Sequence, residues 1–252
     1  MKDKFIFAKA LIYEVGAFIK ANMRKELQIE EKTRFDDLVT NLDQASQDLL
    51  MTRINQAYPN DNIMAEENNV YHSISDGNVW VLDPIDGTVN FVVQGENFAV
   101  MMAYYENGKG QFALIYDINR DQLYSGGGQF EVSVNGVPLL PYCDTPLKRS
   151  LVACNSAMFA NNDYGLQTLI KQTLGVRIYG SAAISLAEVL SGRLIAYFSY
   201  LQPWDYAAGK ILGESLGYVF LTLNGQEPCF NGRQKVMFVP RKKLVLIQSY
   251  LH

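Results

Sequence analysis

The sequence contains few of the residues on which several kinds of chemistry depend. Among its 252 residues there are only three cysteines and two histidines. Cys143, Cys154 and Cys229 have no metal-binding spacing, and a small, odd number of cysteines favours a reducing compartment, which we expect to be the cytoplasm. His72 lies in a polar segment and His252 is the last residue. These positions disfavour a Ser-His-Asp triad, a zinc site and a phosphohistidine mechanism.

Long apolar runs and blocks of positive charge are also lacking. No apolar run reaches the length of a membrane span, and the first residues do not resemble a signal peptide, so we expect no membrane partner. The net charge of −4, from 22 Lys and Arg against 26 Asp and Glu, argues against nucleic acid as a main partner. The content of 48% hydrophobic and 19% charged residues is instead typical of a globular protein with a substantial core.

The most informative stretch is V-W-V-L-D-P-I-D-G-T-V-N-F, residues 79–91. Its first four residues predict a short buried strand that Pro84 would end, and Gly87 permits an unusual backbone conformation before a new helix. Asp83 and Asp86 follow the strand, and paired carboxylates suit a hard cation such as Mg²⁺. The N–H groups at the start of a helix suit an anion. Metal and phosphate side by side indicate phosphoester chemistry, although D-P and D-G are also common turn pairs.

Other acidic residues occur where predicted elements begin or end. Glu66 ends a predicted strand, Asp205 begins a helix in P-W-D-Y-A-A-G, and Asp43 precedes another predicted helix. An aspartate at the start of a helix is usually an N-cap, and this alternative applies to Asp43 and Asp205. Four acids can, however, act together around two or more Mg²⁺ ions, where they would provide a bridging carboxylate and hold a water against phosphorus. These four are Glu66, Asp83, Asp86 and Asp205.

The hydrophobic pattern predicts a protein of the α/β (α+β) class. Residues 1–145 are expected to form helices over a largely antiparallel sheet, and residues 146–252 a smaller alternating α/β half, with the active site in the cleft between them. Residues 25–32 read as a charged, mobile loop. The expected elements are helices at 5–19 and through 49–54, strands at 63–65, 79–82, 98–105, 111–116, 122–125 and 130–134, then strand 151–155, helix 164–174, strand 176–179, helix 183–190, strand 196–200, helix 206–216, strands 218–223 and 236–239, and a closing helix.

Four motifs together resemble the inositol monophosphatase family. The motifs are D-L-V-T-N-L-D, A-E-E, D-P-I-D-G-T-V-N-F and P-W-D-Y-A-A-G. Together with Lys32, the resemblance covers residues 32–209. The resemblance implies a layered α-β-α-β-α fold and a commonly homodimeric enzyme. It also implies Mg²⁺-dependent, lithium-sensitive hydrolysis of a small phosphate monoester, such as an inositol monophosphate or a related sugar or polyol phosphate, by attack of a metal-activated water.

The resemblance also implies roles for individual residues. The ligands of two or three Mg²⁺ ions would be Glu66, Asp83, Ile85 through its carbonyl, Asp86 and Asp205. The catalytic residues would be Thr88, Asp43 and Glu66, with Thr88 hydrogen-bonded towards Asp43 to position the attacking water. The substrate-binding residues would be Lys32, Asp86, Gly87, Thr88, Gly180, Ser181, Ala182 and Asp205.

Two departures from the family pattern concern the substrate and one hairpin. Relatives specialised for inositol monophosphate carry a glutamate seven positions before the W-D aspartate, where this sequence has Phe198. Phenylalanine cannot accept a hydrogen bond from a ring hydroxyl, so we expect a broad or shifted preference; if the strand is offset, Ser199 or Tyr200 would supply the contact. The segment from Gly126 to Gly136 also lacks the family's usual glycine spacing, which predicts a remodelled hairpin.

Other activities remain open from the sequence. Within the family these are 3′(2′),5′-bisphosphate nucleotidase and fructose-1,6-bisphosphatase activity, and a third possibility is a non-catalytic metal-binding regulatory scaffold. An aspartyl-nucleophile phosphatase would need its nucleophile at position 84, which is a proline. Cys143, Arg149 and Ser150 have the C-x5-R-S spacing of cysteine phosphatases, but Pro146 removes a donor from the phosphate loop that this chemistry requires.

Overall fold

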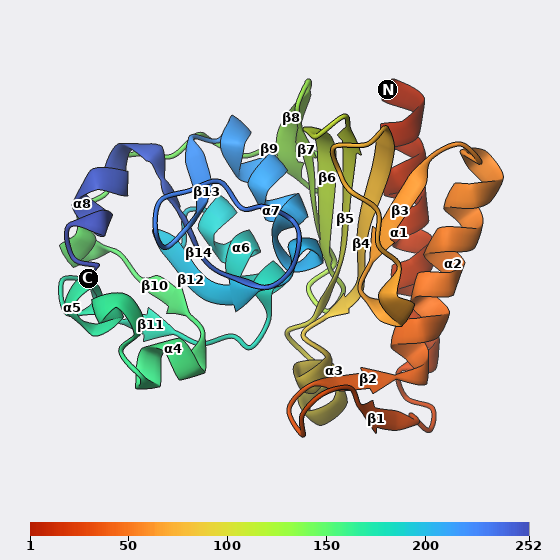
Figure 1. Ribbon diagram of the computed structural model, residues 1–252, viewed down its shortest axis with the longest axis horizontal. Coiled ribbons are helices and arrows are strands. Elements are labelled where there is room, and N and C mark those ends of the chain that lie inside the picture. The colour runs from red at the N-terminus through yellow and green to blue at the C-terminus, as the bar shows by residue number, and fades with distance from the viewer. Residues whose placement is uncertain (252) are drawn as a thin grey trace.

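The computed structural model describes residues 1–251 and contains two main β-sheets (Figure 1). The larger sheet has the strand order β3-β4-β5-β6-β7-β8-β9, and only the β3–β4 pair is parallel. The smaller sheet has the order β11-β10-β12-β14-β13 and mixes parallel and antiparallel pairs. The strands of the two sheets are β3 (Asn62–Ala65), β4 (Asn78–Asp86), β5 (Ala99–Glu106), β6 (Lys109–Asp117), β7 (Gln122–Gly127), β8 (Phe130–Val134), β9 (Val137–Pro138), β10 (Val152–Cys154), β11 (Val176–Arg177), β12 (Ala196–Leu201), β13 (Tyr218–Thr222) and β14 (Gln234–Pro240).

Helices cover both sheets and also fill the space between them, which gives five layers (Figure 1). Helices α1 (Lys2–Asn22) and α2 (Asn41–Ala57) cover the outer face of the larger sheet. Helices α6 (Ala182–Leu190) and α7 (Pro203–Ser215) lie between the sheets, and α4 (Ser156–Ala160), α5 (Leu166–Ile170) and α8 (Leu244–Gln248) cover the smaller one. The predicted α-β-α-β-α class and the largely antiparallel first sheet are therefore confirmed.

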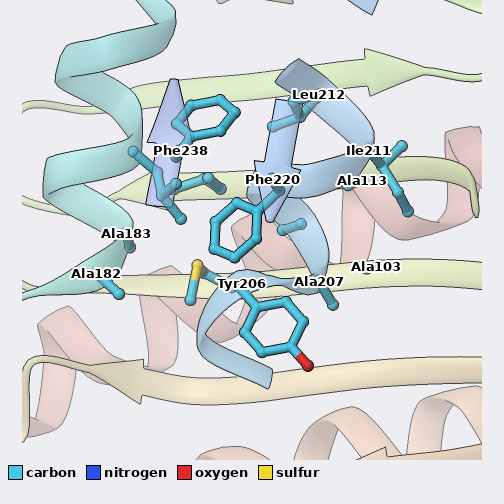
Figure 2. Packing of buried hydrophobic residues seen from close by; sticks show 14 of the residues in the cluster. Ala103, Ala113, Ala182, Ala183, Tyr206, Ala207, Ile211, Leu212, Phe220 and Phe238 are labelled. Carbon is cyan, nitrogen blue, oxygen red and sulfur yellow. The ribbon is translucent and has the colours of Figure 1, made fainter. Parts of the chain in front are cut away.

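The central layer is packed through small residues. In Figure 2, Ala103 of the larger sheet lies near Ala207 of α7 and Ala113 lies near Ile211 of the same helix. The rings of Tyr206 and Phe220 stack with centroids 5.1 Å apart. Alanines on both sides allow the helix and the sheet to approach closely. One continuous apolar core thus joins the two sheets and fixes where the start of α7 lies.

The end of β4 differs from the sequence prediction. The strand does not stop at Leu82 but continues to Asp86, with a shift of register between Asp83 and Asp86 in its pairing with β5. Proline has no N–H to donate to a ladder, and a bulge is the usual way to keep it within a strand. Pro84 therefore bends β4 instead of ending it.

The predicted loop at residues 25–32 is only partly a loop. Strand β1 (Ile29–Glu31) pairs antiparallel with β2 (Leu38–Thr40), and this small hairpin lies beside α3 (Thr88–Gln94) at the lower end of the view in Figure 1. Helix α4 was not expected, and the predicted helix at 164–174 is limited to α5. The basic residues 241–243 form an exposed or half-exposed turn before α8.

The hairpin for which a remodelled shape was expected lies away from the predicted site. Strands β7 and β8 pair with a register shift after Ser125, and Gly126 and Gly127 have positive φ. A Cβ atom on Gly127 would lie 2.4 Å from Cγ2 of Ile211, so this strand approaches α7 too closely for a side chain. Gly127 therefore serves packing against α7, whereas a Cβ atom on Gly126 would meet the backbone of Glu131 and Val132 in β8. Within residues 1–251, no helix has the length and apolar character needed to cross a membrane.

Candidate active site

Three aspartates meet where β4 ends and α7 begins. Carboxylate oxygens of Asp83, Asp86 and Asp205 all lie within 4.8 Å of one another. Asp83 is 1% exposed, and neither of its carboxylate oxygens has a hydrogen-bond partner among residues 1–251. Burial, followed by the negative charges of its neighbours, raises the pKa of Asp83 well above its usual range. Because an unpaired buried carboxylate is unfavourable and oxygen ligands suit Mg²⁺, these residues fit a divalent cation.

The other two aspartates are each held by backbone donors. Oδ2 of Asp205 accepts a hydrogen bond from the Gln202 amide at 2.8 Å, as the third residue of α7 in a capping box. Asp86 accepts bonds from the hydroxyl of Ser181 and from the amides of Ala182 (3.2 Å) and Ala183 (2.8 Å). Burial raises the pKa of Asp86 to about 6 although these donors oppose the rise. Asp86, on the larger sheet, thus caps the first turn of α6.

Thr88 and Asp43 are connected directly. Oγ1 of Thr88 lies 3.1 Å from Oδ1 of Asp43 and 3.1 Å from the carbonyl oxygen of Ile85, and its single hydrogen can be donated to one of them at a time. Asp43 lies in the first turn of α2 and not before the helix, and its Oδ2 accepts bonds from the amide and hydroxyl of Thr40. Burial raises the pKa of Asp43 to about 6.

Gly87 separates the carboxylates from α3 and has no room for a side chain. It adopts φ 88°, and a Cβ atom there would lie 3.0 Å from Cβ of Ser181 and 3.1 Å from the carbonyl oxygen of Asn97. The left-handed conformation alone disfavours any residue with a Cβ. The turn therefore requires glycine for two independent reasons.

Lys32, which follows β1, reaches across to two glutamates. Its Nζ lies 2.9 Å from Oε1 of Glu66 and 2.6 Å from Oε1 of Glu67. Burial lowers the pKa of Lys32, but the two glutamates outweigh burial and raise it overall. Glu66 lines the same cavity as the three aspartates. The small hairpin is thus attached to the site by an ion pair.

The sequence interpretation missed Glu67 and Gln47. The amide of Glu67 donates to Oε1 of Gln47, and Nε2 of Gln47 donates to the carbonyl of Glu67, both at 2.8 Å. Burial raises the pKa of Glu67 to about 7. The second glutamate of A-E-E was visible in the sequence, but its partner Gln47 could not be found from spacing.

The segment Gly180–Ala182 lies against α3, on the opposite wall. Nδ2 of Asn90 donates to the carbonyl of Tyr179 at 2.7 Å, and a Cβ atom on Gly180 would lie 2.9 Å from Oδ1 of Asn90. Gly180, Ser181 and Ala182 line a cavity of about 200 Å³ beside Asp86. The Ser181 hydroxyl, however, is donated to Asp86.

Phe198 does not occupy the substrate-facing position that counting back from the W-D aspartate assigns to it. Phe198 is fully buried in the outer core of the smaller sheet with Cys154 and Met237, and it does not line the cavity. Side chains alternate along a strand, so its neighbour Ser199 has the opposite orientation. Ser199 lines the cavity instead, and the exposed Tyr200 lines it too, as the offset alternative expected.

A large cleft opens from the carboxylates between the two halves. It has a volume of about 830 Å³ and is lined by Lys32, Glu66, Asn155, Trp204, Asp205 and Arg233, among others. Pockets for drug-sized ligands span roughly 300–1,000 Å³. The site can therefore hold a molecule larger than a phosphate ion.

The fold and this carboxylate cluster define a metal-dependent phosphomonoesterase. A sequence model described as the inositol monophosphatase family matches residues 1–250, and the chain belongs to this family. It is 38% identical over 256 residues to inositol-1-monophosphatase of Bacillus subtilis (97% of this chain, 95% of the relative). It is 31% identical over 229 residues to the fructose-1,6-bisphosphatase/inositol-1-monophosphatase of Thermotoga maritima (89% and 87%).

Solved structures agree with this assignment. The staphylococcal protein SaIMPase-II bound to inositol monophosphate superposes with a TM-score of 0.87 at 31% identity, covering 99% of this chain and 93% of that one. The same protein bound to 2′AMP gives a TM-score of 0.89 at 33% identity, with 99% and 94% coverage. The protein is thus a phosphatase whose family supports a divalent metal cofactor and a small phosphorylated substrate.

Proposed function

We propose that the enzyme hydrolyses small phosphate monoesters of polyols or sugars at the Asp83–Asp86–Asp205 cluster, with two or three Mg²⁺ ions and with inhibition by Li⁺. The observation that supports this most strongly is the buried Asp83 carboxylate, which lacks a hydrogen-bond partner within residues 1–251. The ligands would be the three aspartates, Glu66 and the carbonyl of Ile85. Bound Mg²⁺ would supply Lewis acidity, which makes a water more nucleophilic and neutralises charge on the phosphoryl oxygens.

The residues of the chain would orient the water and receive its proton. With its hydrogen donated to Asp43, the Thr88 hydroxyl keeps lone pairs that can accept a hydrogen bond from the attacking water. A carboxylate with a pKa of about 6 is suited to accept a proton near neutral pH, and Asp43 has this value. Glu66, beside the same cavity, would assist in placing the water. No covalent intermediate is required.

The phosphate would be held by backbone groups. The amides of Gly87 and Thr88 are at the start of α3, and both residues line the same cavity as the three aspartates. Gly180, Ser181 and Ala182 would form the opposite wall. Lys32 would approach the phosphate from the β1–β2 hairpin.

The alcohol part of the substrate would face Ser199 and Tyr200. A serine hydroxyl can exchange hydrogen bonds with a ring hydroxyl, but it lacks the charge of a glutamate. We therefore expect inositol 1-phosphate to be cleaved without a clear advantage over other small monoesters. The names of the relatives, which include a fructose-1,6-bisphosphatase and a 2′AMP complex, support a broad preference.

The proposal also covers the cellular compartment and the oligomeric state of the enzyme. All three cysteines are free thiols, which supports the cytoplasm as the compartment. Exposed Leu174 and Ile178 flank the edge strand β11, and Val93 of α3 is also exposed. Exposed apolar side chains at a sheet edge support a homodimer through this region.

A substrate panel tests the proposed function. Purified protein with Mg²⁺ should hydrolyse inositol 1-phosphate, fructose 1,6-bisphosphate and 2′-AMP, and EDTA should abolish release of inorganic phosphate until Mg²⁺ is restored. Hydrolysis that continues in EDTA, or the absence of hydrolysis across the panel, would contradict it. The second result, with Mg²⁺ binding retained, would favour the regulatory scaffold.

A further inference from the structure

Arg233 lies on the wall of the cleft that belongs to the smaller sheet. Its Nε–H donates to the carbonyl of Tyr200 at 3.1 Å, and its guanidinium carbon lies 4.6 Å from the centroid of the Tyr200 ring. Tyr200 is 40% exposed, and both residues line the cleft. A guanidinium is a rigid planar fork, so one hydrogen bond and one stacking contact are enough to fix its plane.

The guanidinium has no acidic partner in the part of the chain that the structure describes. Among residues 1–251, no carboxylate oxygen lies within 4.0 Å of Arg233, whereas Lys32 is paired with Glu66 and Glu67, and Lys235 is paired with Asp163 at 2.7 Å. The Nε–H bond uses only one of the five donors of the arginine, and the Nη groups remain available. Arg233 therefore presents unpaired positive charge to the cleft.

This charge is close to the proposed reaction site. Arg233 and Asp205 line the same 200 Å³ cavity, together with Asp86 and Ser199. Burial raises the pKa of Asp205, and the positive charge of Arg233 opposes that rise. A substrate whose phosphate lies at the aspartates would extend its alcohol part along this wall towards Arg233.

We propose that Arg233 is a specificity-determining residue that binds a second phosphate on the alcohol part of the substrate. The inference rests on the proposed function, because it takes the aspartate cluster as the place of reaction. Two Nη groups in one plane match two phosphate oxygens. The enzyme then prefers a bisphosphate to the same molecule without the second phosphate.

Matched substrate pairs test this preference. The pairs are adenosine 2′,5′-bisphosphate with 2′-AMP, and inositol 1,4-bisphosphate with inositol 1-phosphate. We expect kcat/KM to be about fivefold higher for at least one bisphosphate, a modest factor because an exposed ion pair is worth up to about 1 kcal/mol. In Arg233→Gln the ratio should fall to about one, whereas Arg233→Lys should keep part of it. The wild-type preference should weaken as NaCl is raised, because salt screens exposed charges.

The control is Arg241→Gln, at an exposed arginine before α8 that does not line the cleft. It should keep the wild-type ratio. Calorimetric titration of the metal-free protein with each nucleotide gives a second readout, in which Arg233→Gln should weaken binding of the bisphosphate about fivefold and binding of 2′-AMP by less.

The outcomes separate the two proposals. If single-phosphate esters are hydrolysed but the wild-type ratio is about one for both pairs, or Arg233→Gln leaves the ratio unchanged, the role of Arg233 is wrong and the proposed function stands. If no ester is hydrolysed with Mg²⁺, the proposed function fails. Equal calorimetric affinities of wild type and Arg233→Gln for the bisphosphate would then reject the Arg233 site as well.

Discussion

Replacement of Asp83 by asparagine should stabilise the metal-free protein and nearly abolish its activity. Asn has almost the same shape as Asp but carries no charge. In the folded protein the Asp83 carboxylate is buried beside Asp86, Asp205 and Glu66, without a hydrogen-bond donor among residues 1–251. The negative charge that would hold Mg²⁺ is therefore unfavourable for folding when Mg²⁺ is absent.

The magnitude follows from the cost of an unsatisfied buried group. That cost is about 1–3 kcal/mol and is larger when the group is charged, so removal of the charge should gain at least about 1 kcal/mol. For a protein of this size, 1 kcal/mol corresponds to a rise in Tm of roughly 2–4 °C. Loss of a proposed Mg²⁺ ligand should lower kcat/KM by more than tenfold, which is a rise of about 1.4 kcal/mol in the barrier.

The dependence of stability on pH provides an internal check. Asp43 and Asp86 have pKa values of about 6 in the folded protein, above the value of about 3.9 in an unfolded chain. The folded state therefore binds protons more tightly, and the metal-free protein should become more stable as pH falls from 8 through 6. The slope should be smaller in Asp83→Asn, because one carboxylate with a raised pKa is gone. It should also be smaller in wild type with saturating Mg²⁺, because the cation takes the place of the protons.

Differential scanning calorimetry in EDTA and in Mg²⁺, with phosphate release as the activity assay, measures all three effects. The matched control is Asp48→Asn, on the exposed side of α2, which should change neither the Tm by more than about 1 °C nor the rate. The reasoning is refuted if Asp83→Asn keeps more than a tenth of the wild-type rate, or if its metal-free Tm at pH 8 does not exceed that of wild type.

Substitutions at three further residues test the proposed site and its alternative. Thr88→Val removes the hydroxyl that donates to Asp43 and should lower kcat at least about a hundredfold, while Thr88→Ser should keep most of it; equal rates for the two variants would contradict the role of the hydroxyl. Gly87→Ala places a Cβ 3.0 Å from that of Ser181 at φ 88°, and thermal unfolding should report a loss of about 1–3 kcal/mol. Cys143→Ser, at an exposed residue outside the cleft, should leave the rate unchanged; an inactive but folded variant would favour the cysteine mechanism.

The position of Asp43 illustrates what local spacing can and cannot reveal. Thr40 and Asp43 form a capping box, which can be read from T-x-x-D as the start of a helix. Apolar periodicity places Asp43 before the helix instead, because boundaries inferred from it are uncertain by a few residues. The contact of its other oxygen with Thr88, 45 residues away, was expected only through the family resemblance.

The β1–β2 hairpin and the bulge in β4 had weaker signals. All three residues of β1 are exposed, so no alternation of apolar and polar residues marks it as a strand. A proline directly after an apolar run predicts the end of a strand, and only the pairing with β5 reveals that the strand continues past Pro84. In both cases pairing with another strand determines the structure: β1 pairs with the nearby β2, and β4 pairs with β5.

The error at Phe198 has a physical cause in the layered fold. Helices cover both faces of the smaller sheet, so β12 has apolar residues on both sides: Tyr197 and Leu201 in the central core, Ala196 and Phe198 in the outer one. The sequence of a strand that is buried on both faces has no alternation of apolar and polar residues, so it does not reveal which side chains face the site. Counting residues from a motif then identifies a position without its orientation, and an offset of one reverses the side chain.

Asp86 is an example of a residue whose role could be predicted from the sequence although its contacts in the folded protein could not. Its residue type and its position after a strand indicate a metal ligand, and this prediction needs only neighbouring residues. In the structure the same carboxylate also accepts bonds from Ser181, Ala182 and Ala183, nearly a hundred residues later. These donors fix the carboxylate from the side of α6, and the carboxylate caps that helix in return. The geometry of the cluster thus depends on contact between the two halves, so a change in the packing of α6 should disturb the site even where every motif residue is retained.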